Sequence, residues 1–222
     1  MNEHSFMPGG TMPESETSRE LSPREQKYRR ILRAAIEVFA SKGYFGARMT
    51  DVAEAAAVAD GTLYLYFEGK EHLLMSIFDS VLGRFIDRLD EEIASIDDPL
   101  QKLSVMIRLH LETLGRDHAL AQVLQIETRH SRRFMSLFTR GKLGEYLNRV
   151  RDIIEEGQEV GAFRRDISPG LATNLVFGAV DELVMSWLLA ENPGDLVRHH
   201  KALLGMLTDG IAPCRNHHGG SA

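Results

Sequence analysis

Residues whose side chains could bind a nucleic acid lie close together between positions 48 and 70. Hydroxyl, phenol and ammonium groups can donate hydrogen bonds to phosphate oxygens, and such contacts fix the position of a protein on DNA. Thr62 could also bond a base edge, and Leu63 could lie against the methyl group of thymine. We therefore predict a DNA-binding surface that comprises Arg48, Thr50, Gly61, Thr62, Leu63, Tyr64, Tyr66 and Lys70.

Two short helices joined by a tight turn would bring these side chains together. The pattern predicts one helix over residues 51–56, with Thr50 as its N-cap, and another over residues 60–66. We favour Asp60 as the N-cap of the later helix, although it could instead face the DNA. Small residues at the leading end of this helix keep it slender enough for the major groove, which is about 12 Å wide.

Longer helices must support this pair. Ser22 and Pro23 are typical of a helix start, and Gly43 can end that helix in the left-handed conformation. Lys70 begins a further long helix, where its ammonium group and the helix dipole would together form a phosphate clamp.

The continuous segment around these residues matches a known pattern. Residues 49–74, MTDVAEAAAVADGTLYLYFEGKEHLL, closely resemble the signature of the TetR (AcrR) family of bacterial transcription regulators. The resemblance implies an all-α fold of about nine helices, with a three-helix DNA-binding head and a helical bundle that binds ligand and dimerises. It also implies DNA contacts from the eight residues above, a homodimer on palindromic operator DNA, and release by a small hydrophobic effector.

Two positions in the predicted turn depart from the family pattern. Members of the family usually have glycine where this chain has Ala57, and often serine where it has Ala59. Alanine at positive φ costs about 1 kcal/mol relative to glycine, so we expect a strained but tolerable turn.

Further segments resemble the branch of the family that represses fatty-acid degradation genes. They are residues 58–67, 85–88, 125–127 and 177–182, and Trp187. This resemblance implies that a long-chain acyl-CoA relieves the repression.

An acyl-CoA effector would need an apolar tunnel for its chain and a cationic mouth for its phosphates. We predict ligand contacts from Leu103, Ile107, Leu111, Arg129, Arg133, Phe134, Phe138, Phe177 and Asp181. The alternative is that the apolar residues are ordinary core and the arginines are solvated. Asp181 and Glu182 either line the pocket or lie in a subunit interface, and His110 is expected to be a core histidine.

The rest of the chain is predicted to be helical, because no stretch alternates apolar and polar residues as strands do. Further helices are predicted over residues 70–96, 100–114, 120–126, 134–157, 169–191 and 195–209. The last two, the eighth and ninth, have broad apolar surfaces that would form a four-helix bundle across a two-fold axis. We divide the chain into a disordered tail (1–20), a helix-turn-helix domain (21–85), a ligand-binding and dimerisation domain (86–212) and a second tail (213–222).

The composition is that of a soluble globular protein, with 222 residues, 43% hydrophobic residues and a net charge of −6. Residues 19–75 hold nine Lys/Arg against eight Asp/Glu, so a locally basic head would sit on an acidic body. A solvated helix face is the plainer interpretation of these charges. The N-terminus lacks an apolar signal region, no uninterrupted apolar run has the length of a membrane span, and Cys214 has no partner. We therefore expect a cytoplasmic protein without membrane contact.

No catalytic or metal-binding pattern is evident. The adjacent histidines at 199–200 and 217–218 lack the i, i+4 spacing of helical metal ligands, and no nucleophile elbow or phosphate-binding glycine loop is present. We expect no cofactor, no metal and no enzyme activity. The alternatives are a TetR-type regulator of a multidrug efflux pump, which acids in the pocket would favour, a helical enzyme, and a helical adaptor.

Overall fold

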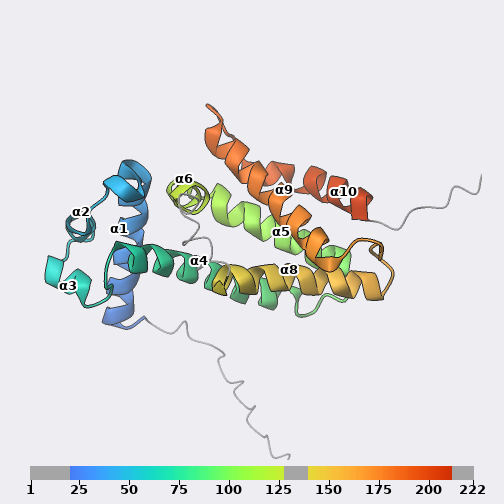
Figure 1. Cartoon of the computed structure of the whole chain (residues 1–222), viewed down its shortest axis with the longest axis horizontal. Helices are drawn as coiled ribbons and strands as arrows, with labels where there is room; N and C mark the ends of the chain where they lie inside the picture. Colours follow the sequence, from blue (N-terminus) through green and yellow to red (C-terminus); the bar gives the residue numbers. More distant parts are fainter. Residues whose placement is uncertain (1–20, 128–139, 212–222) are drawn as a thin grey trace, which may run out of the picture.

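The computed structural model describes residues 21–127 and 140–211, and these residues form helices and no strand. Its helices are α1 (Pro23–Gly46), α2 (Met49–Ala55), α3 (Asp60–Tyr64), α4 (Lys70–Ile93), α5 (Pro99–Gly115), α6 (His118–Gln122), the π-helical turn η1 (Val123–Glu127), α8 (Lys142–Glu159), α9 (Pro169–Leu189), the 3-10 turn η2 (Leu196–His199) and α10 (His200–Ile211). The all-α prediction is confirmed (Figure 1).

The start of the first helix is as predicted, but its end is not, because the helix is kinked at Gly43 and continues to Gly46. The Ser22 hydroxyl accepts from the backbone N–H of Glu25 (3.2 Å), and the Glu25 carboxylate accepts from the backbone N–H of Ser22 (2.9 Å). These two bonds satisfy N–H groups that a helix start otherwise leaves open. Gly43 has φ +71°, which interrupts the helical backbone before a last turn that ends at Gly46.

The helices form a head and a body that share α4 (Figure 1). The head consists of α1, α2, α3 and the beginning of α4, whereas α5, α8, α9 and α10 make up the body. Since α4 is continuous from Lys70 to Ile93, it passes without a break through the boundary predicted at residue 85. A single continuous helix therefore connects the body to the head.

The short helix α6 forms a second connection, because it lies against α1. The Gln122 side-chain amide donates to the carbonyl oxygen of Ala40 (2.7 Å), and the Arg33 guanidinium is paired with the Asp117 carboxylate. The predicted helix 120–126 is thus split into α6 and the π-helical turn η1.

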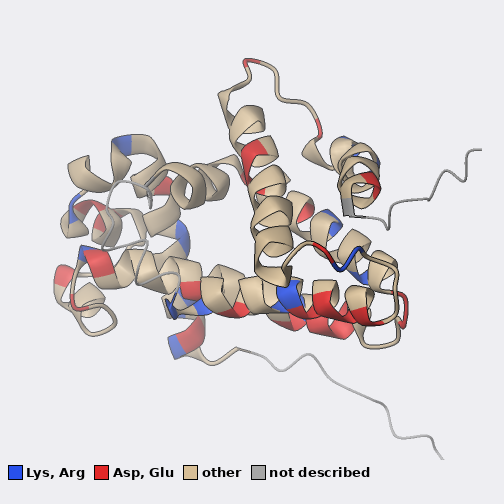
Figure 2. Ribbon diagram, turned by 45° about the vertical axis from the view of Figure 1, so that its right-hand side comes forward, with Lys and Arg blue, Asp and Glu red and all other residues tan. Residues whose placement is uncertain are grey.

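The predicted helix over residues 134–157 is only partly confirmed. Residues 134–139 lie outside the described part of the chain, and α8 begins at Lys142, after Gly141 in a non-helical conformation. Acidic residues crowd the end of α8 that lies farthest from the head (Figure 2).

Candidate DNA-binding surface and effector cavity

The turn between α2 and α3 is closed by two backbone hydrogen bonds. The N–H of Ala57 donates to the carbonyl oxygen of Glu54 (3.0 Å), and the N–H of Val58 donates to that of Ala53 (3.0 Å). This closure places Ala57 at φ +50°, and no other non-glycine residue in the described ranges has a positive φ. The turn therefore has the strained alanine that the sequence predicted.

Both predicted N-caps are wrong. The N-cap of α2 is Arg48, and Thr50 lies inside the helix. Asp51 takes over the capping role, since its carboxylate accepts from the backbone N–H of Arg48 (2.8 Å) and pairs with the Lys42 ammonium group (2.8 Å). The contact with Lys42 and, after it, the hydrogen bond from Arg48 lower the pKa of Asp51. The N-cap of α3 is Ala59, and the Asp60 side chain makes no capping hydrogen bond.

The outer face of α3 presents polar groups to solvent. Tyr64 is 56% exposed, Thr62 is half-buried, and a side chain at Gly61 would meet no atom within 4 Å. Arg48 and Thr50 are also exposed, at the beginning of α2. Tyr66 is half-buried, with its ring 6.3 Å from that of Tyr28. The residues that the sequence singled out, with one exception, therefore reach the surface.

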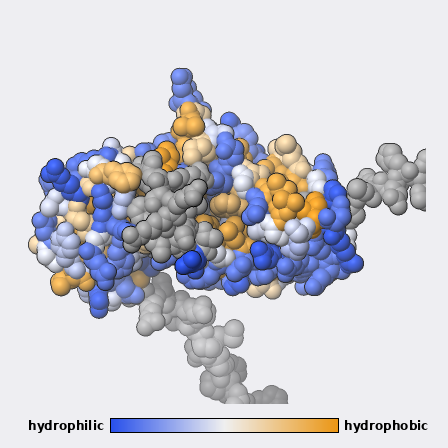
Figure 3. Space-filling model, in the orientation of Figure 1, coloured by the Kyte–Doolittle hydropathy of each residue, from blue (hydrophilic) through white to orange (hydrophobic). Residues whose placement is uncertain are grey.

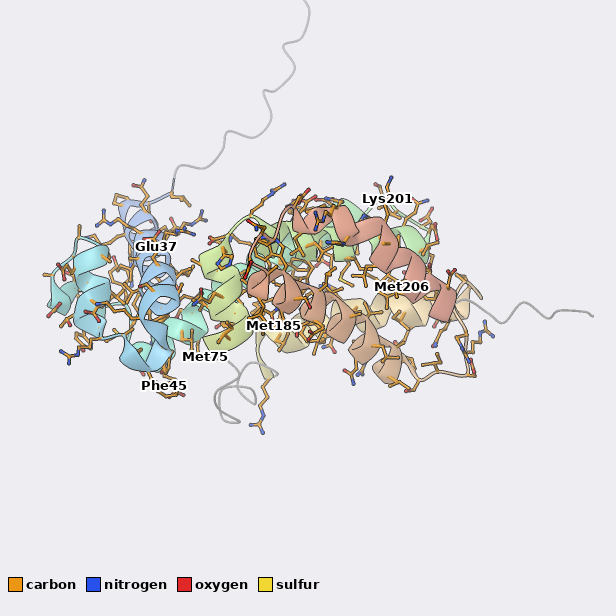
Figure 4. The ribbon with its side chains drawn as sticks, turned by 90° about the horizontal axis from the view of Figure 1, so that it is seen from above. Glu37, Phe45, Met75, Met185, Lys201 and Met206 are labelled. Atoms are coloured by element: carbon orange, nitrogen blue, oxygen red, sulfur yellow. The ribbon has the colours of Figure 1, made fainter. Side chains whose placement is uncertain are left out.

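The exception is Leu63, whose side chain is completely buried. It cannot lie against a thymine methyl group as predicted, because α3 is only five residues long and needs an apolar anchor to the head. Leu65 is 80% exposed instead. Phe45, which projects from the tip of the head, is 69% exposed (Figure 4). Neither residue stands out in the sequence, because large apolar residues in an amphipathic pattern usually belong to the core.

Lys70 has partners within the head. Its ammonium group donates to the carbonyl oxygens of Phe45 (3.2 Å) and Ala47 (2.9 Å) and lies 4.7 Å from the centre of the Tyr44 ring. These contacts tie the chain after α1 to the start of α4. Since an ammonium group has three donors, one remains for the predicted phosphate contact.

The body contains an apolar cavity with a volume of about 110 Å³. Helices α4, α5, α8, α9 and the turn η1 surround it. Its lining residues are Phe78, Val81, Leu82, Phe85, His110, Thr113, Leu114, Leu124, Gln125, Leu143, Tyr146, Phe177 and Asp181. No lysine or arginine is among these described lining residues.

Two hydrogen-bonded pairs of polar residues line this cavity. His110 Nδ1 lies 2.9 Å from the Tyr146 hydroxyl, and the Gln125 side-chain amide donates to Asp181 Oδ1 (2.7 Å). Two further atoms, His110 Nε2 and Gln125 Oε1, are buried without a hydrogen-bond partner among the described residues. A buried polar atom without a partner is costly, so a ligand or a water molecule that supplies one is favoured.

Burial controls the protonation of these groups. It lowers the pKa of His110 to about 4, although the nearby Asp181 carboxylate acts in the opposite direction. Burial, together with Asp181, raises the pKa of Tyr146. His110 is therefore neutral at pH 7 and offers a hydrogen bond rather than a charge.

The predicted ligand contacts divide into three groups. Phe177 and Asp181 line the cavity. Leu103, Ile107 and Leu111 are completely buried and are not among the described residues that line it. The remaining four, Arg129, Arg133, Phe134 and Phe138, lie outside the described residues.

The positions of these residues on α5 explain the difference. The cavity meets the second half of the helix, at His110, Thr113 and Leu114. Leu103 shares the face of His110 but lies about two turns earlier, and Ile107 and Leu111 are turned toward an adjacent face that packs in the core. His110 was expected to be an ordinary core residue, but it forms part of the cavity wall. The polar residues at 110 and 113 on a mostly apolar helix were the available signal.

The two acids on α9 have different surroundings. Asp181 faces the cavity, whereas Glu182 is exposed on the outside of the body, where the Ser186 hydroxyl contacts it (3.4 Å). Asp181 thus lines the cavity, which is one of the two alternatives left open by the sequence, whereas a place for Glu182 in a subunit interface stays a prediction. Within the described ranges, no group of three or more His, Cys, Asp or Glu could hold a metal ion.

Sequence models of two known regions match the chain. The model of bacterial regulatory proteins of the tetR family matches residues 31–77, and that of the C-terminal region of YsiA-like proteins matches residues 78–210. The fatty acid metabolism regulator protein of Bacillus subtilis is 37% identical over 195 residues, which is 86% of this chain and 98% of that protein.

Solved structures of such regulators are similar over nearly their whole length. The fatty acid degradation regulator FadR from Bacillus halodurans superimposes with a TM-score of 0.80 at 36% identity and covers 86% of this chain and 98% of its own. FadR from Bacillus subtilis in complex with stearoyl-CoA gives a TM-score of 0.79 at 36% identity, over 83% of this chain and 99% of its own.

Proposed function

Because this chain belongs to the TetR family of bacterial regulatory proteins and is a transcription regulator rather than an enzyme, we propose that it represses fatty-acid degradation genes. A homodimer binds palindromic operator DNA through α2 and α3 of each head, in the cytoplasm. A long-chain acyl-CoA in the cavity of the body releases the DNA.

The exposed face of α3 supports the DNA-binding part of this proposal. Its leading end is slender at Gly61, and Thr62 and Tyr64 place hydroxyl groups where they can reach bases and phosphates. Arg48, Thr50, Tyr66 and the remaining donor of Lys70 would contact the backbone. One head reads few base pairs, so two heads in successive major grooves supply the specificity.

The apolar cavity supports the proposal that the effector is an acyl-CoA. Its walls are largely aromatic and aliphatic, as a fatty acyl chain requires, and the similar regulator from Bacillus subtilis was solved with stearoyl-CoA. Phe78, Val81 and Phe85 of α4 line the cavity, and the same helix supports the head at its N-terminal end. An acyl chain that displaces α4 would move the heads away from the spacing of one DNA turn, about 34 Å.

A gel-shift series with a promoter fragment and increasing stearoyl-CoA tests this proposal. We expect retention without ligand and release with it, since a coupling of about 1–3 kcal/mol lowers affinity 5- to 150-fold. Free CoA and stearate are the controls for the two parts of the ligand. Unchanged retention at saturating stearoyl-CoA would overturn the effector proposal and leave DNA binding intact, whereas absence of any promoter footprint at low salt would overturn DNA binding itself.

Helices α9 and α10 support the homodimer. Helix α9 has the length and the apolar composition of a helix that could cross a membrane. Only 33% of its most apolar stretch is buried inside the protein. Leu171 and Leu175 are each about half exposed on it, and Met206 of α10 is 78% exposed. Figure 3 shows an apolar patch over α9, and Figure 4 shows Met206 on the outside of α10.

A second copy of the chain is the proposed cover of this patch. Gly178 and Ser186 are exposed small residues that allow close approach, and a side chain at Gly178 would meet no atom within 4 Å. A Leu171→Glu/Leu175→Glu variant should therefore elute as a monomer in light-scattering chromatography. Val160→Glu, at an exposed apolar position outside α9 and α10, is the matched control. A dimer of unchanged size in the double variant would place the interface elsewhere.

A second candidate function keeps the fold but changes the ligand. Asp181 places a carboxylate in the cavity, and the described lining residues contain no lysine or arginine, which favours a lipophilic cation. A regulator of a multidrug efflux pump would have such a cavity. Thermal-shift measurements with acyl-CoAs and with lipophilic cations separate the two functions, because only the true effector class stabilises the folded protein.

A further inference from the structure

A second pocket, with a volume of about 190 Å³, lies where the head meets the body. Helix α1 contributes Arg29 and Arg33, α4 contributes Ser80 and Arg84, and the segment of α6 contributes Asp117 and Leu120. Because α6 forms one wall, this pocket faces the body rather than the exposed face of α3.

The charges in this pocket are not balanced. Arg33 is paired with Asp117 and with Glu37, so the only carboxylate of the described lining already has a partner. Arg29 and Arg84 form no ion pair or hydrogen bond with any residue that the structure describes. Both arginines are exposed residues, and partial burial of Arg84 together with the neighbouring Arg29 lowers its pKa. Two like charges held near each other in this way attract an anion.

The pocket adjoins the apolar cavity through α4. Val81 lines both spaces, Phe78 and Phe85 face the cavity, and Ser80 and Arg84 face the pocket. The chain segment after α5 has the same arrangement, with Leu120 at the pocket and Leu124 at the cavity. A ligand with an apolar chain and an anionic end could therefore occupy both.

We propose that Arg29 and Arg84 bind the phosphate groups of the acyl-CoA whose acyl chain occupies the cavity. This inference rests on the proposed function and deepens it. Guanidinium groups bind phosphate oxygens with paired hydrogen bonds, which suits this role. Since Arg29 belongs to the head and Arg84 to the shared helix, the phosphates would also hold α1 against α4. The nucleotide end of the effector thus acts on the position of the head.

Titration calorimetry with two ligands tests the assignment. Palmitoyl-CoA carries the phosphates, and S-palmitoyl-pantetheine carries the same thioester chain without them. We expect Arg29→Gln/Arg84→Gln to weaken palmitoyl-CoA binding at least about tenfold and to leave palmitoyl-pantetheine binding unchanged. The matched control is Arg30→Gln/Arg116→Gln, which removes the same charge at exposed positions outside both pockets. Thermal unfolding of each variant verifies that it is folded.

Several results would overturn the assignment. If the wild type prefers palmitoyl-CoA and the Arg29/Arg84 variant keeps that preference, the phosphates bind elsewhere. If the wild type binds both ligands equally, the phosphates contribute nothing. If it binds neither ligand, the proposed effector fails as well, which distinguishes that failure from the first two. If the variant loses affinity for operator DNA but not for palmitoyl-CoA, the two arginines serve DNA.

Discussion

In the head, the groups that would meet DNA stand on a five-residue helix and face solvent, whereas the polar groups of the body are enclosed by apolar side chains. Tyr64 is 56% exposed, but the side chain of Gln125 is only 3% exposed. Water can satisfy the hydroxyl groups of the head until DNA replaces it. In the cavity, His110 Nε2 and Gln125 Oε1 have no such partner among the described residues.

This difference affects how ligand binding and stability are related in each region. Each unsatisfied buried polar atom lowers the stability of the folded protein by about 1–3 kcal/mol. A ligand that forms a hydrogen bond with this atom removes that cost. The body is therefore less stable without ligand than an all-apolar core of the same size. The head has no comparable defect on its DNA-binding face, so substitutions there should change binding and leave stability nearly unaffected.

The largest expected effect tests this separation within the head. Leu63→Ala should lower the free energy of unfolding by about 2–5 kcal/mol, because it empties a fully buried position. Tyr64→Ala, one residue away, should change it by less than about 0.5 kcal/mol and weaken operator binding about 5- to 100-fold. Urea unfolding and fluorescence anisotropy with an operator fragment measure the two quantities. Equal loss of stability in both variants would contradict the separation.

The same separation explains which parts could be predicted from the sequence. The head was predictable because capping residues, Gly43 and the polar positions of α3 each leave a local signal. The N-caps at Arg48 and Ala59 were not, because Asp51 reaches back to the chain and Ala59 offers no side-chain acceptor. Leu63 and Leu65 have the same residue type, and only the packing of α3 decides which of them is buried.

The cavity was harder to predict because its lining and the core have the same composition. Leu111 and Leu114 both belong to an apolar stripe, yet only Leu114 lines the cavity. Which face of α5 meets empty space depends on α4, α8 and α9, whose placement the sequence does not contain. Polar exceptions such as His110 and Asp181 were the more reliable signal, since an enclosed polar residue needs a reason.

The second prediction concerns the pH dependence of stability, which the enclosed histidine should dominate. Burial holds the pKa of His110 at about 4, below its ordinary value of 6.5. Between these values the unfolded chain binds the proton more readily, so the contribution of His110 is complete above pH 6.5 and is lost as the pH falls toward 4. The slope there approaches about 1.4 kcal/mol per pH unit.

Urea unfolding of the wild type and of His110→Gln at pH 7, 5.5 and 4.5 measures this slope. The difference between the two proteins should shrink toward low pH, because the other titrating groups are common to both. His118→Gln, at an exposed position on α6, is the matched control. Parallel curves for wild type and His110→Gln would show that His110 is not enclosed.

A third, smaller effect is expected at Lys70. Unlike the other polar groups of the DNA-binding surface, its ammonium group makes hydrogen bonds within the head. Lys70→Met removes the donors to the carbonyl oxygens of Phe45 and Ala47 and should lower the free energy of unfolding by about 1–2 kcal/mol. Lys201→Met, on the outside of α10 (Figure 4), should have almost no effect.

Lys70 also offers a way to measure its proposed phosphate contact. If its third donor binds the DNA backbone, the slope of log affinity against log salt should fall by about one in Lys70→Met. An unchanged slope, together with lost stability, would restrict Lys70 to the internal contacts.

The smallest expected effect is a gain. Ala57 holds the turn between α2 and α3 at φ +50°, a conformation that glycine adopts freely and alanine does not. Ala57→Gly should therefore relieve about 1 kcal/mol of strain, of which the greater freedom of glycine in the unfolded chain removes a part. We expect a net stabilisation of about 0.5 kcal/mol, measured by urea unfolding. Ala55→Gly, at the exposed last residue of α2, should destabilise by about 0.5 kcal/mol. Opposite signs for two alanines only two positions apart would show that backbone conformation, not side-chain contact, sets the stability of the DNA-binding turn.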